Sequence, residues 1–426
     1  MILNKYKLEL LFIYKLTLSI FAVPMKHLFL LLITTTLISS ISIAKDKKIK
    51  SGTWRTEFKL NTKSSLPFII EYNKKTNNIV LINASERILL KNVQIKGDII
   101  SVKFPIFNSE LIGKIISKKR IEGFWHNYSK GKDYKIPFVS ICNSKSRFDK
   151  PQTNSKQFEG KWEVTFDYTE SKEKAIGLFK SVKGSMHGTF LTETGDYRFL
   201  EGVSNGNSLK LSCFDGSHAF LFTSKLKNDT LWGEFYSGSH YKTNWFAVKN
   251  ESFELRDPEK LTYLINNDPI KFNLPQLDGK MYSYPNKSSE NKVVIIQIMG
   301  TWCPNCMDET NYLIDLYAKH KNEIEIFGIG FEAGETQEDK IKTISTYKNY
   351  MNVNYPLLVG GDACKPCAVE IFPMLNNVMS FPTLLIIDKK GDIRKIHTGF
   401  SGPSTGKYYT NFIIHTNQFI EQLIKE

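Results

Sequence analysis

The feature that most constrains the fold is a pair of cysteines placed where a predicted strand gives way to a predicted helix. Residues 293–299 form an apolar run typical of a strand buried on both faces. Residues 304–320 have the pattern of a helix, and they begin with a proline, which needs no N–H donor in the first turn. Between them stands the motif Gly300-Thr301-Trp302-Cys303-Pro304-Asn305-Cys306. This order predicts an α/β unit with two thiols at a helix N-terminus.

That position has a chemical consequence for the first thiol. Unpaired backbone N–H groups and the helix dipole stabilise a thiolate there, and cysteines so placed have pKa values lowered to roughly 3.5–7.5. We therefore expect Cys303 to attack a disulfide, and Cys306, one turn on and more buried, to resolve the mixed disulfide. A structural disulfide and half of a zinc site are the alternatives, and the strand–helix context disfavours both.

A second motif, Ser380-Phe381-Pro382-Thr383, follows a predicted helix and opens an apolar strand. A cis-proline here would expose the backbone of Phe381 for strand-like pairing with a substrate peptide. Proline also begins strands without any such role. The position of this motif after the C-x-x-C favours a cis-Pro382 that docks the substrate, with Trp302, Phe381 and Thr383 as substrate contacts.

A second cysteine pair, Cys364-Lys365-Pro366-Cys367, lies in a loop before a predicted helix. Three interpretations stay open, in this order of preference. The pair forms a local disulfide that ties the helix start, or a relay dithiol that exchanges with Cys303 and Cys306, or part of a four-cysteine zinc site. No His closely accompanies either pair, so we expect no metal. No Gly-rich phosphate loop stands out, and we expect no cofactor.

Strands and helices alternate along the rest of the C-terminal third, which predicts a mixed sheet with flanking helices. The lead-in, residues 253–267, reads as a short helix or an irregular segment, and residues 272–280 read as a short hairpin. The other predicted elements are strands at 324–331 and 356–359, helices at 336–351, 368–378 and 408–424, and a hairpin at 383–388 and 393–397.

Residues 270–426 resemble the TlpA/ResA-like thiol–disulfide oxidoreductases, within the wider thioredoxin and peroxiredoxin superfamily. The resemblance rests on Phe272-Asn273-Leu274-Pro275, Asp278-Gly279-Lys280, Gly300-Thr301-Trp302-Cys303-x-x-Cys306, Glu309 and Phe381-Pro382-Thr383. It implies a thioredoxin-like fold and a reductant that receives electrons from a membrane partner.

The resemblance also implies a role for Glu309. An acidic residue three positions after the second cysteine tunes the thiols and shuttles protons in this family, and a solvated helix carboxylate is the alternative. The chain departs from the family at Thr310-Asn311, where many members have a proline that kinks the helix.

Residues 51–142 and 158–250 look like two copies of one β-rich unit. Gly52-Thr53-Trp54 opens the first copy and Gly160-Lys161-Trp162 the second, and alternating runs separated by turn signals follow each. We predict two small antiparallel β-barrels or β-sandwiches, with each Trp filling a barrel end. This opening motif resembles the start of lipocalin-like barrels. Cys142 and Cys213, one in each copy, are expected to be small core residues.

Residues 1–44 predict an N-terminal extension and a signal peptide. The apolar run 28–44 ends in Ser42-Ile43-Ala44, a small-x-small cleavage pattern, and it is short for a membrane span. Translation then starts at Met25 rather than Met1, or the segment is an uncleaved membrane anchor. Export, to the periplasm or beyond, would place the dithiol where disulfides persist.

The charge balance does not point to nucleic acid. The chain carries 57 Lys and Arg against 43 Asp and Glu, for a net charge of +14. The Lys residues are spread along the whole chain and no dense Arg run appears, which is typical of a solvated surface.

These features together predict an exported enzyme, a protein-disulfide reductase, with thiol- or disulfide-bearing client proteins and a membrane electron donor as partners. In the alternative, the β-rich units are a binding or scaffold module for lipid, glycan or protein, and the C-terminal domain is a redox-sensing appendage. A peroxiredoxin ranks lower, because Thr301-Trp302-Cys303 lacks the proline that precedes a peroxidatic cysteine.

Overall fold

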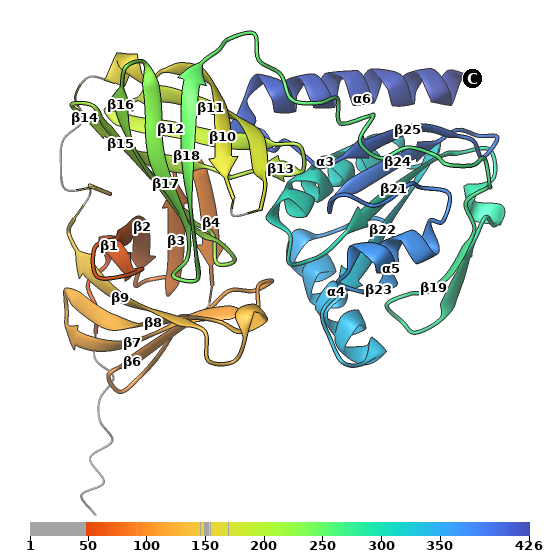
Figure 1. The fold of residues 1–426 in the computed structure, drawn as a ribbon. Coiled ribbons are helices and arrows are strands. Elements are labelled where there is room, and N and C mark those ends of the chain that lie inside the picture. Colours follow the sequence, from red (N-terminus) through yellow and green to blue (C-terminus); the bar gives the residue numbers. More distant parts are fainter. Residues whose placement is uncertain (1–47, 92, 145, 149–152, 154, 169) are drawn as a thin grey trace, which may run out of the picture. The chain divides into compact units, whose positions relative to one another are not determined.

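The structure is a computed structural model, and it describes residues 48–91, 93–144, 146–148, 153, 155–168 and 170–426 (Figure 1). The predicted extension and signal peptide, including both candidate start sites, lie outside these residues. Among the described residues, none of the helices has both the length and the apolar content that a membrane span requires.

The first β-rich segment forms one antiparallel sheet in the strand order β4-β3-β2-β1-β9-β8-β7-β6-β5. Side chains alternate between buried and more exposed along β1, as expected for a strand with one face on a core. The strands are β1 (Gly52–Lys59), β2 (Ser65–Asn73), β3 (Asn78–Asn83), β4 (Glu86–Leu90), β5 (Gln94–Lys96), β6 (Ile99–Lys103), β7 (Ser109–Ser117), β8 (Arg120–Asn127) and β9 (Lys135–Cys142).

The second β-rich segment forms a sheet in the order β11-β10-β18-β17-β16-β15-β14-β12-β13. Because β11 also pairs with β12, this sheet closes on itself as a barrel. The strands are β10 (Gly160–Asp167), β11 (Lys172–Val182), β12 (Ser185–Thr192), β13 (Gly195–Asp196), β14 (Leu200–Asn205), β15 (Ser208–Phe214), β16 (Ala219–Lys227), β17 (Thr230–Ser237) and β18 (Tyr241–Lys249).

The two opening tryptophans occupy equivalent positions in the two sheets. Trp54 and Trp162 are both buried, and each indole N–H donates to the backbone carbonyl four residues earlier, of Lys50 and Phe158 respectively. The sheets are not independent, however, since Phe214 of the second packs into the core of the first. The β-rich character is therefore confirmed, and the origin of the two sheets as repeats of one unit stays a prediction. Cys142 and Cys213 are both buried, as expected.

The C-terminal segment has a five-stranded sheet in the order β23-β22-β21-β24-β25, preceded by a β19–β20 hairpin. Strands β21, β22 and β23 are parallel, and β24 and β25 run antiparallel to their neighbours. This is a thioredoxin-like arrangement. Its elements are β19 (Phe272–Pro275), β20 (Met281–Tyr284), β21 (Val293–Met299), α3 (Pro304–His320), β22 (Ile324–Glu332), α4 (Gln337–Met351), β23 (Leu357–Asp362), α5 (Lys365–Ile371), β24 (Thr383–Ile387), β25 (Ile393–Thr398) and α6 (Lys407–Lys425).

The predicted helix at 368–378 was misplaced. Helix α5 begins at Lys365, because Cys364 accepts the Cys367 N–H as an N-cap and Pro366 suits a first turn. It ends at Ile371, two residues before Pro373, and a residue that precedes proline disfavours the helical conformation. The lead-in at 253–267 is irregular rather than helical.

Candidate functional site

The two thiols of the first pair lie where β21 ends and α3 begins, as the motif predicts. Cys303 is the N-cap of α3, and its Sγ accepts the backbone N–H of Cys306 at 3.2 Å. The Cys303 thiol also contacts the Phe381 carbonyl oxygen at 3.4 Å. Cys303 is 8% exposed and Cys306 is 0% exposed, and both are free thiols. Only the outer sulfur can therefore meet a substrate.

The Cys306 thiol is the more deeply buried of the two, and burial changes its pKa. Burial raises the pKa of Cys306 well above its ordinary value, and the hydrogen bond with Cys303 acts in the same direction. Cys306 therefore keeps its proton until a base removes it.

The loop before β24 lies directly against Cys303. Its Phe381–Pro382 peptide bond is cis. The Phe381 ring packs edge-on against Trp302, with ring centroids 5.5 Å apart, and the Trp302 indole N–H donates to the Phe331 carbonyl at 3.0 Å. Trp302 is half-exposed at the site, whereas Thr383 is buried and its hydroxyl donates to the Ser380 carbonyl within the loop. Thr383 thus stabilises the conformation of the loop through this hydrogen bond.

Glu309 lies beneath the dithiol on α3, one turn after Cys306. The Gln297 side-chain amide donates to Glu309 Oε2 at 2.9 Å and to the Cys306 carbonyl at 3.2 Å. Oε1 of Glu309 has no hydrogen-bond partner among the described residues. Burial raises the pKa of Glu309 to about 8. The alternative of a solvated helix carboxylate is wrong, because the side chain is fully buried.

Thr310 belongs to the Thr310-Asn311 pair at which the chain departs from the family that it resembles. Its hydroxyl donates to Gln297 Oε1 at 3.0 Å and accepts from the Tyr347 hydroxyl at 2.8 Å. Helix α3 continues without a break from Pro304 to His320. A buried chain of hydrogen bonds therefore fixes the helix to Gln297 at this point.

Glu332, the last residue of β22, also lies at the site and was not among the predicted residues. Its two carboxylate oxygens accept the backbone N–H and the hydroxyl of Thr301, at 2.7 and 2.8 Å. Burial raises the pKa of Glu332 to about 7. The available signal was an acidic residue at the end of an otherwise apolar strand, where burial of a carboxyl group is costly unless it is hydrogen-bonded. Glu332 holds the turn that leads into Cys303.

A buried arginine from the second β-rich segment also reaches the site, and it was not predicted. Arg198 forms ion pairs with Asp308 on α3 and with Glu86 on β4, the latter at 2.7 Å. It also donates to the Pro304 carbonyl, inside the C-x-x-C spacer, at 3.3 Å. Burial raises the pKa of Asp308 to about 7, against the opposing effect of Arg198. No local pattern in the sequence signals this contact.

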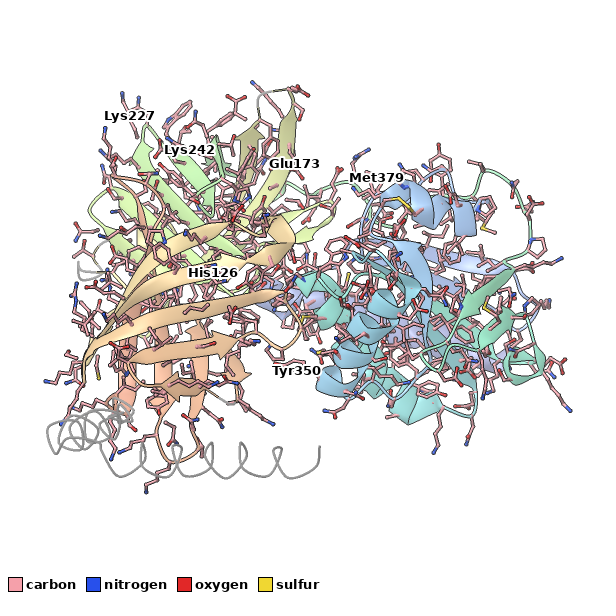
Figure 2. The ribbon with its side chains drawn as sticks, turned by 90° about the horizontal axis from the view of Figure 1, so that it is seen from below. His126, Glu173, Lys227, Lys242, Tyr350 and Met379 are labelled. Carbon is pink, nitrogen blue, oxygen red and sulfur yellow. A yellow bond between two sulfur atoms is a disulfide. The ribbon has the colours of Figure 1, made fainter. Side chains whose placement is uncertain are left out.

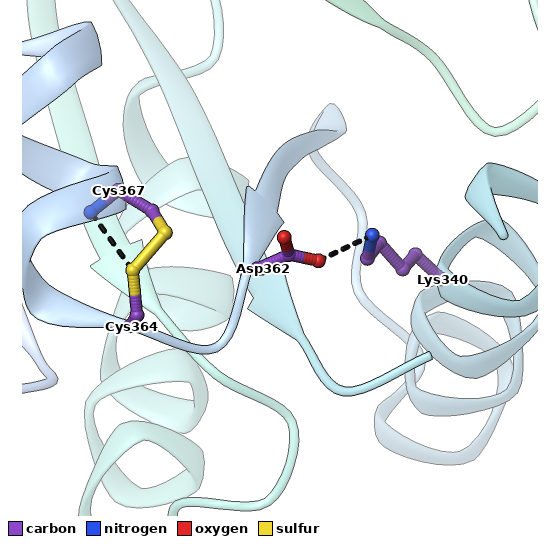
Figure 3. The surroundings of a disulfide bond; sticks show 4 residues. All are labelled: Lys340, Asp362, Cys364 and Cys367. Carbon is purple, nitrogen blue, oxygen red and sulfur yellow. Dashed lines mark hydrogen bonds and ion pairs between the residues drawn. A yellow bond between two sulfur atoms is a disulfide. The ribbon is translucent and has the colours of Figure 1, made fainter. Parts of the chain in front are cut away.

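The second cysteine pair forms a disulfide at the start of α5 (Figure 3). Cys364 Sγ accepts the Cys367 N–H at 3.0 Å, and a Lys340–Asp362 ion pair of 2.6 Å lies nearby, at the end of β23. The structure contains the local disulfide, and exchange with Cys303 and Cys306 stays a prediction. Within the described ranges, no group of three His, Cys, Asp or Glu residues is arranged to hold a metal ion.

The C-terminal segment is similar to known thiol–disulfide oxidoreductases. Residues 265–396 match the AhpC/TSA family. The chain is 29% identical over 162 residues to the thiol:disulfide interchange protein DsbE of Escherichia coli strain K12, which covers 37% of this chain and 78% of the relative. It is 27% identical over 147 residues to the thiol-disulfide oxidoreductase ResA of Bacillus subtilis strain 168, which covers 34% of this chain and 74% of the relative.

Among solved structures, a thiol:disulfide interchange protein of the thioredoxin family from Chlorobium tepidum TLS aligns with a TM-score of 0.29 and 17% identity, over 37% of this chain and 97% of that chain. The motifs, the sheet order and the curated relatives agree on one segment of the chain. Residues of about 270–426 are a thioredoxin-like domain similar to the TlpA/ResA-like thiol–disulfide oxidoreductases, within the AhpC/TSA and thioredoxin superfamily.

Proposed function

We propose that this chain is an exported thiol–disulfide oxidoreductase that works as a protein-disulfide reductase. One observation carries the proposal. Cys303 caps α3 and its Sγ accepts the Cys306 N–H, and of the two cysteines only Cys303 keeps any exposure, at 8% against 0%. Such a position presents the attacking sulfur to a client and protects the resolving one.

The reaction follows from these two environments. The Cys303 thiolate attacks a client disulfide, a mixed disulfide forms, and the first client sulfur leaves and takes up a proton. Cys306 then attacks Cys303, releases the second client thiol and leaves a Cys303–Cys306 disulfide. Glu309 is the proposed acceptor of the Cys306 proton, because the Gln297 amide donates to both the Glu309 carboxyl group and the Cys306 backbone carbonyl. The exchange needs no cofactor.

The loop at Pro382 is the proposed docking site for the client chain. The Phe381 carbonyl lies 3.4 Å from Cys303 Sγ, so a chain paired with this backbone would bring its sulfur to the nucleophile. Trp302 supplies an exposed aromatic surface beside it. Thr383 contributes by holding the loop.

The compartment and partners are part of the same proposal. Residues 28–44 would direct export, and a membrane protein would return the enzyme to its dithiol form after each turnover. Disulfide-bearing client proteins are the proposed substrates. The segments 51–142 and 158–250 are the proposed β-rich domains that accompany the redox domain.

The test is a pair of cysteine variants of the full chain in an insulin-reduction assay. Cys303→Ser should abolish turnover, and Cys306→Ser should accumulate a covalent mixed disulfide that is visible by mass spectrometry. Cys142→Ser, a buried thiol of β9, is the matched control and should keep full activity. Undiminished reduction by Cys303→Ser would disprove the proposal.

A further inference from the structure

A short segment of the second β-rich domain, Thr192–Arg198, lies against both sides of the dithiol. The Asn305 side-chain amide, inside the C-x-x-C, contacts the Asp196 carbonyl at 3.4 Å. The Ser380 hydroxyl, just before the Phe381–Pro382 bond, donates to the Thr194 carbonyl at 2.9 Å. The segment therefore spans the surface where a client chain would have to approach Cys303.

Two buried charges fasten this segment. Asp196 accepts the Gly402 N–H at 2.6 Å and the Ser404 hydroxyl at 3.0 Å. Arg198 pairs with Asp308 and donates to the Pro304 carbonyl. Hydrogen bonds to charged groups of this kind are stronger than neutral ones.

The segment and the redox domain approach each other closely at two glycines, where no side chain would fit. A Cβ added at Gly195 would lie 1.9 Å from the Asn305 amide nitrogen, and one added at Gly399 would lie 2.8 Å from the Thr194 carbonyl carbon. The contact is thus made at the level of the backbone.

A cavity of about 300 Å³ remains between the segment and the dithiol. Trp302, Cys303 and Asn305 line it from the redox domain. The β-rich domain contributes aromatic and polar groups, namely Thr194, Tyr197, His218, Phe220 and Glu173, which projects from β11 (Figure 2). This volume equals that of about ten water molecules in the liquid, which is room for a short stretch of extended chain. A folded client would have to approach Cys303 past the Thr192–Arg198 segment.

We propose that the Thr192–Arg198 segment is the outer wall of the substrate pocket, and that it restricts Cys303 to disulfides carried on a narrow, extended chain. The inference rests on the proposed function of the dithiol and adds the substrate class. Two electrons pass from the Cys303–Cys306 dithiol to such a disulfide, which leaves as two thiols, and the membrane dithiol donor restores the enzyme.

The test compares two substrates with the full-length protein. Oxidised glutathione presents a disulfide between two short peptides, and native insulin presents disulfides within a folded protein. If the Thr192–Arg198 segment restricts access to Cys303, kcat/KM for oxidised glutathione should exceed kcat/KM for insulin. Equal or greater kcat/KM for insulin would overturn this inference.

Two variants change the size of the pocket in opposite directions. Thr194→Trp fills it and should lower kcat/KM for oxidised glutathione by about tenfold. Phe220→Ala widens it and should raise kcat/KM for insulin by about tenfold. The reduction potential of the Cys303–Cys306 couple should stay unchanged in both, which separates a wall from a change in thiol chemistry.

Matched controls come from the same barrel, away from the pocket. Thr230→Trp and Phe246→Ala, on β17 and β18, should leave the ratio of the two kcat/KM values unchanged. If Phe220→Ala fails to fold, Thr194→Trp decides the matter alone. If the wild-type protein reduces neither substrate, the proposed function is contradicted. If the wild type is active but neither Thr194→Trp nor Phe220→Ala changes the ratio of the two kcat/KM values, only the proposed wall is contradicted.

Discussion

Two carboxyl groups lie beneath the dithiol and both are buried. Glu309 has one hydrogen bond, from Gln297, and Glu332 has two, from Thr301. Desolvation disfavours a charged carboxylate, so burial raises the pKa of Glu309 to about 8 and that of Glu332 to about 7. Glu309 is thus poised to exchange a proton near neutral pH, while Glu332 serves the geometry of the turn before Cys303.

Replacement of Glu309 by Gln should change how stability depends on pH. The folded state holds the Glu309 proton up to a pKa of about 8, whereas the unfolded chain releases it near the ordinary glutamate pKa of about 4.5. The free energy of unfolding therefore falls between these two pH values, by at most about 1.4 kcal/mol per pH unit for one proton. Glu309→Gln removes that contribution and flattens the curve.

Urea unfolding at a series of pH values from 4.5 to 9 measures the effect. Glu332→Gln is the companion variant, and its influence should end near pH 7 because its pKa is about 7. Parallel curves for the wild type and Glu309→Gln would show that the Glu309 carboxyl is not a titrating group in this range.

At the scale of single elements, α5 shows how a disulfide can set a helix start. Cys364 caps the helix and is covalently tied to Cys367 in its first turn. A helix of seven residues is too short to persist on its own propensity, since isolated helices below about 12 residues are marginal. The disulfide and the packing of buried Ala368 keep α5 in place.

Removal of the second disulfide should cost a modest amount of stability. For a loop closed over so few residues, the chain-entropy estimate is about 2 kcal/mol. The double variant Cys364→Ser, Cys367→Ser keeps a good N-cap, because serine caps helices well. Thermal unfolding under non-reducing conditions should show the loss, and the difference should shrink when the wild type is reduced.

The same variant decides between a local disulfide and a relay. A local disulfide predicts an unchanged reduction potential for the Cys303–Cys306 couple and unchanged turnover with the physiological donor. A relay predicts that turnover is lost while reduction of the enzyme by dithiothreitol is retained. Equilibration of the full-length variants with glutathione buffers measures the potential.

At the scale of residues 48–426, one buried cluster joins three parts of the chain. Arg198 from the second β-rich segment pairs with Glu86 from the first and with Asp308 from the redox domain. All three side chains are largely shielded from water, so the pairs are little screened. Loss of the guanidinium would leave two buried carboxylates without their partner.

Arg198→Met should therefore be strongly destabilising, by about 3–5 kcal/mol. Asp308→Asn in the same background should recover part of that loss, because the variant removes one of the unpaired charges. Urea unfolding of the two single variants and the double variant forms a cycle that isolates the Arg198–Asp308 coupling.

Lys242→Met is the control for Arg198→Met, because it removes an exposed ion pair instead of a buried one. Lys242 and its partner Glu234 are both half-exposed on the second barrel, and Lys242 is labelled in Figure 2. An exposed pair is worth about 0–1 kcal/mol. A cost for Arg198→Met no larger than that of Lys242→Met would show that the cluster contributes little to stability.

The local structure of the redox domain could be predicted from the sequence alone. The apolar run 293–299, the C-x-x-C and the following helix are set by residues close together in the chain, and β21 and α3 have the predicted bounds. The β-rich character of residues 51–250 followed from alternation in the same way. These features were predictable because side-chain period and helix capping are decided within a few residues.

The surroundings of the dithiol, in contrast, depend on contacts between distant parts of the chain. Arg198 and Asp308 are separated by 110 residues, and neither stands in a recognisable motif. The burial of Glu309 depends on how α3 packs on the sheet, and the wall over Cys303 depends on how β12–β13 meets the redox domain. Such contacts form between segments remote in sequence, so their energies depend on the docking of whole elements and leave no periodic pattern along the chain.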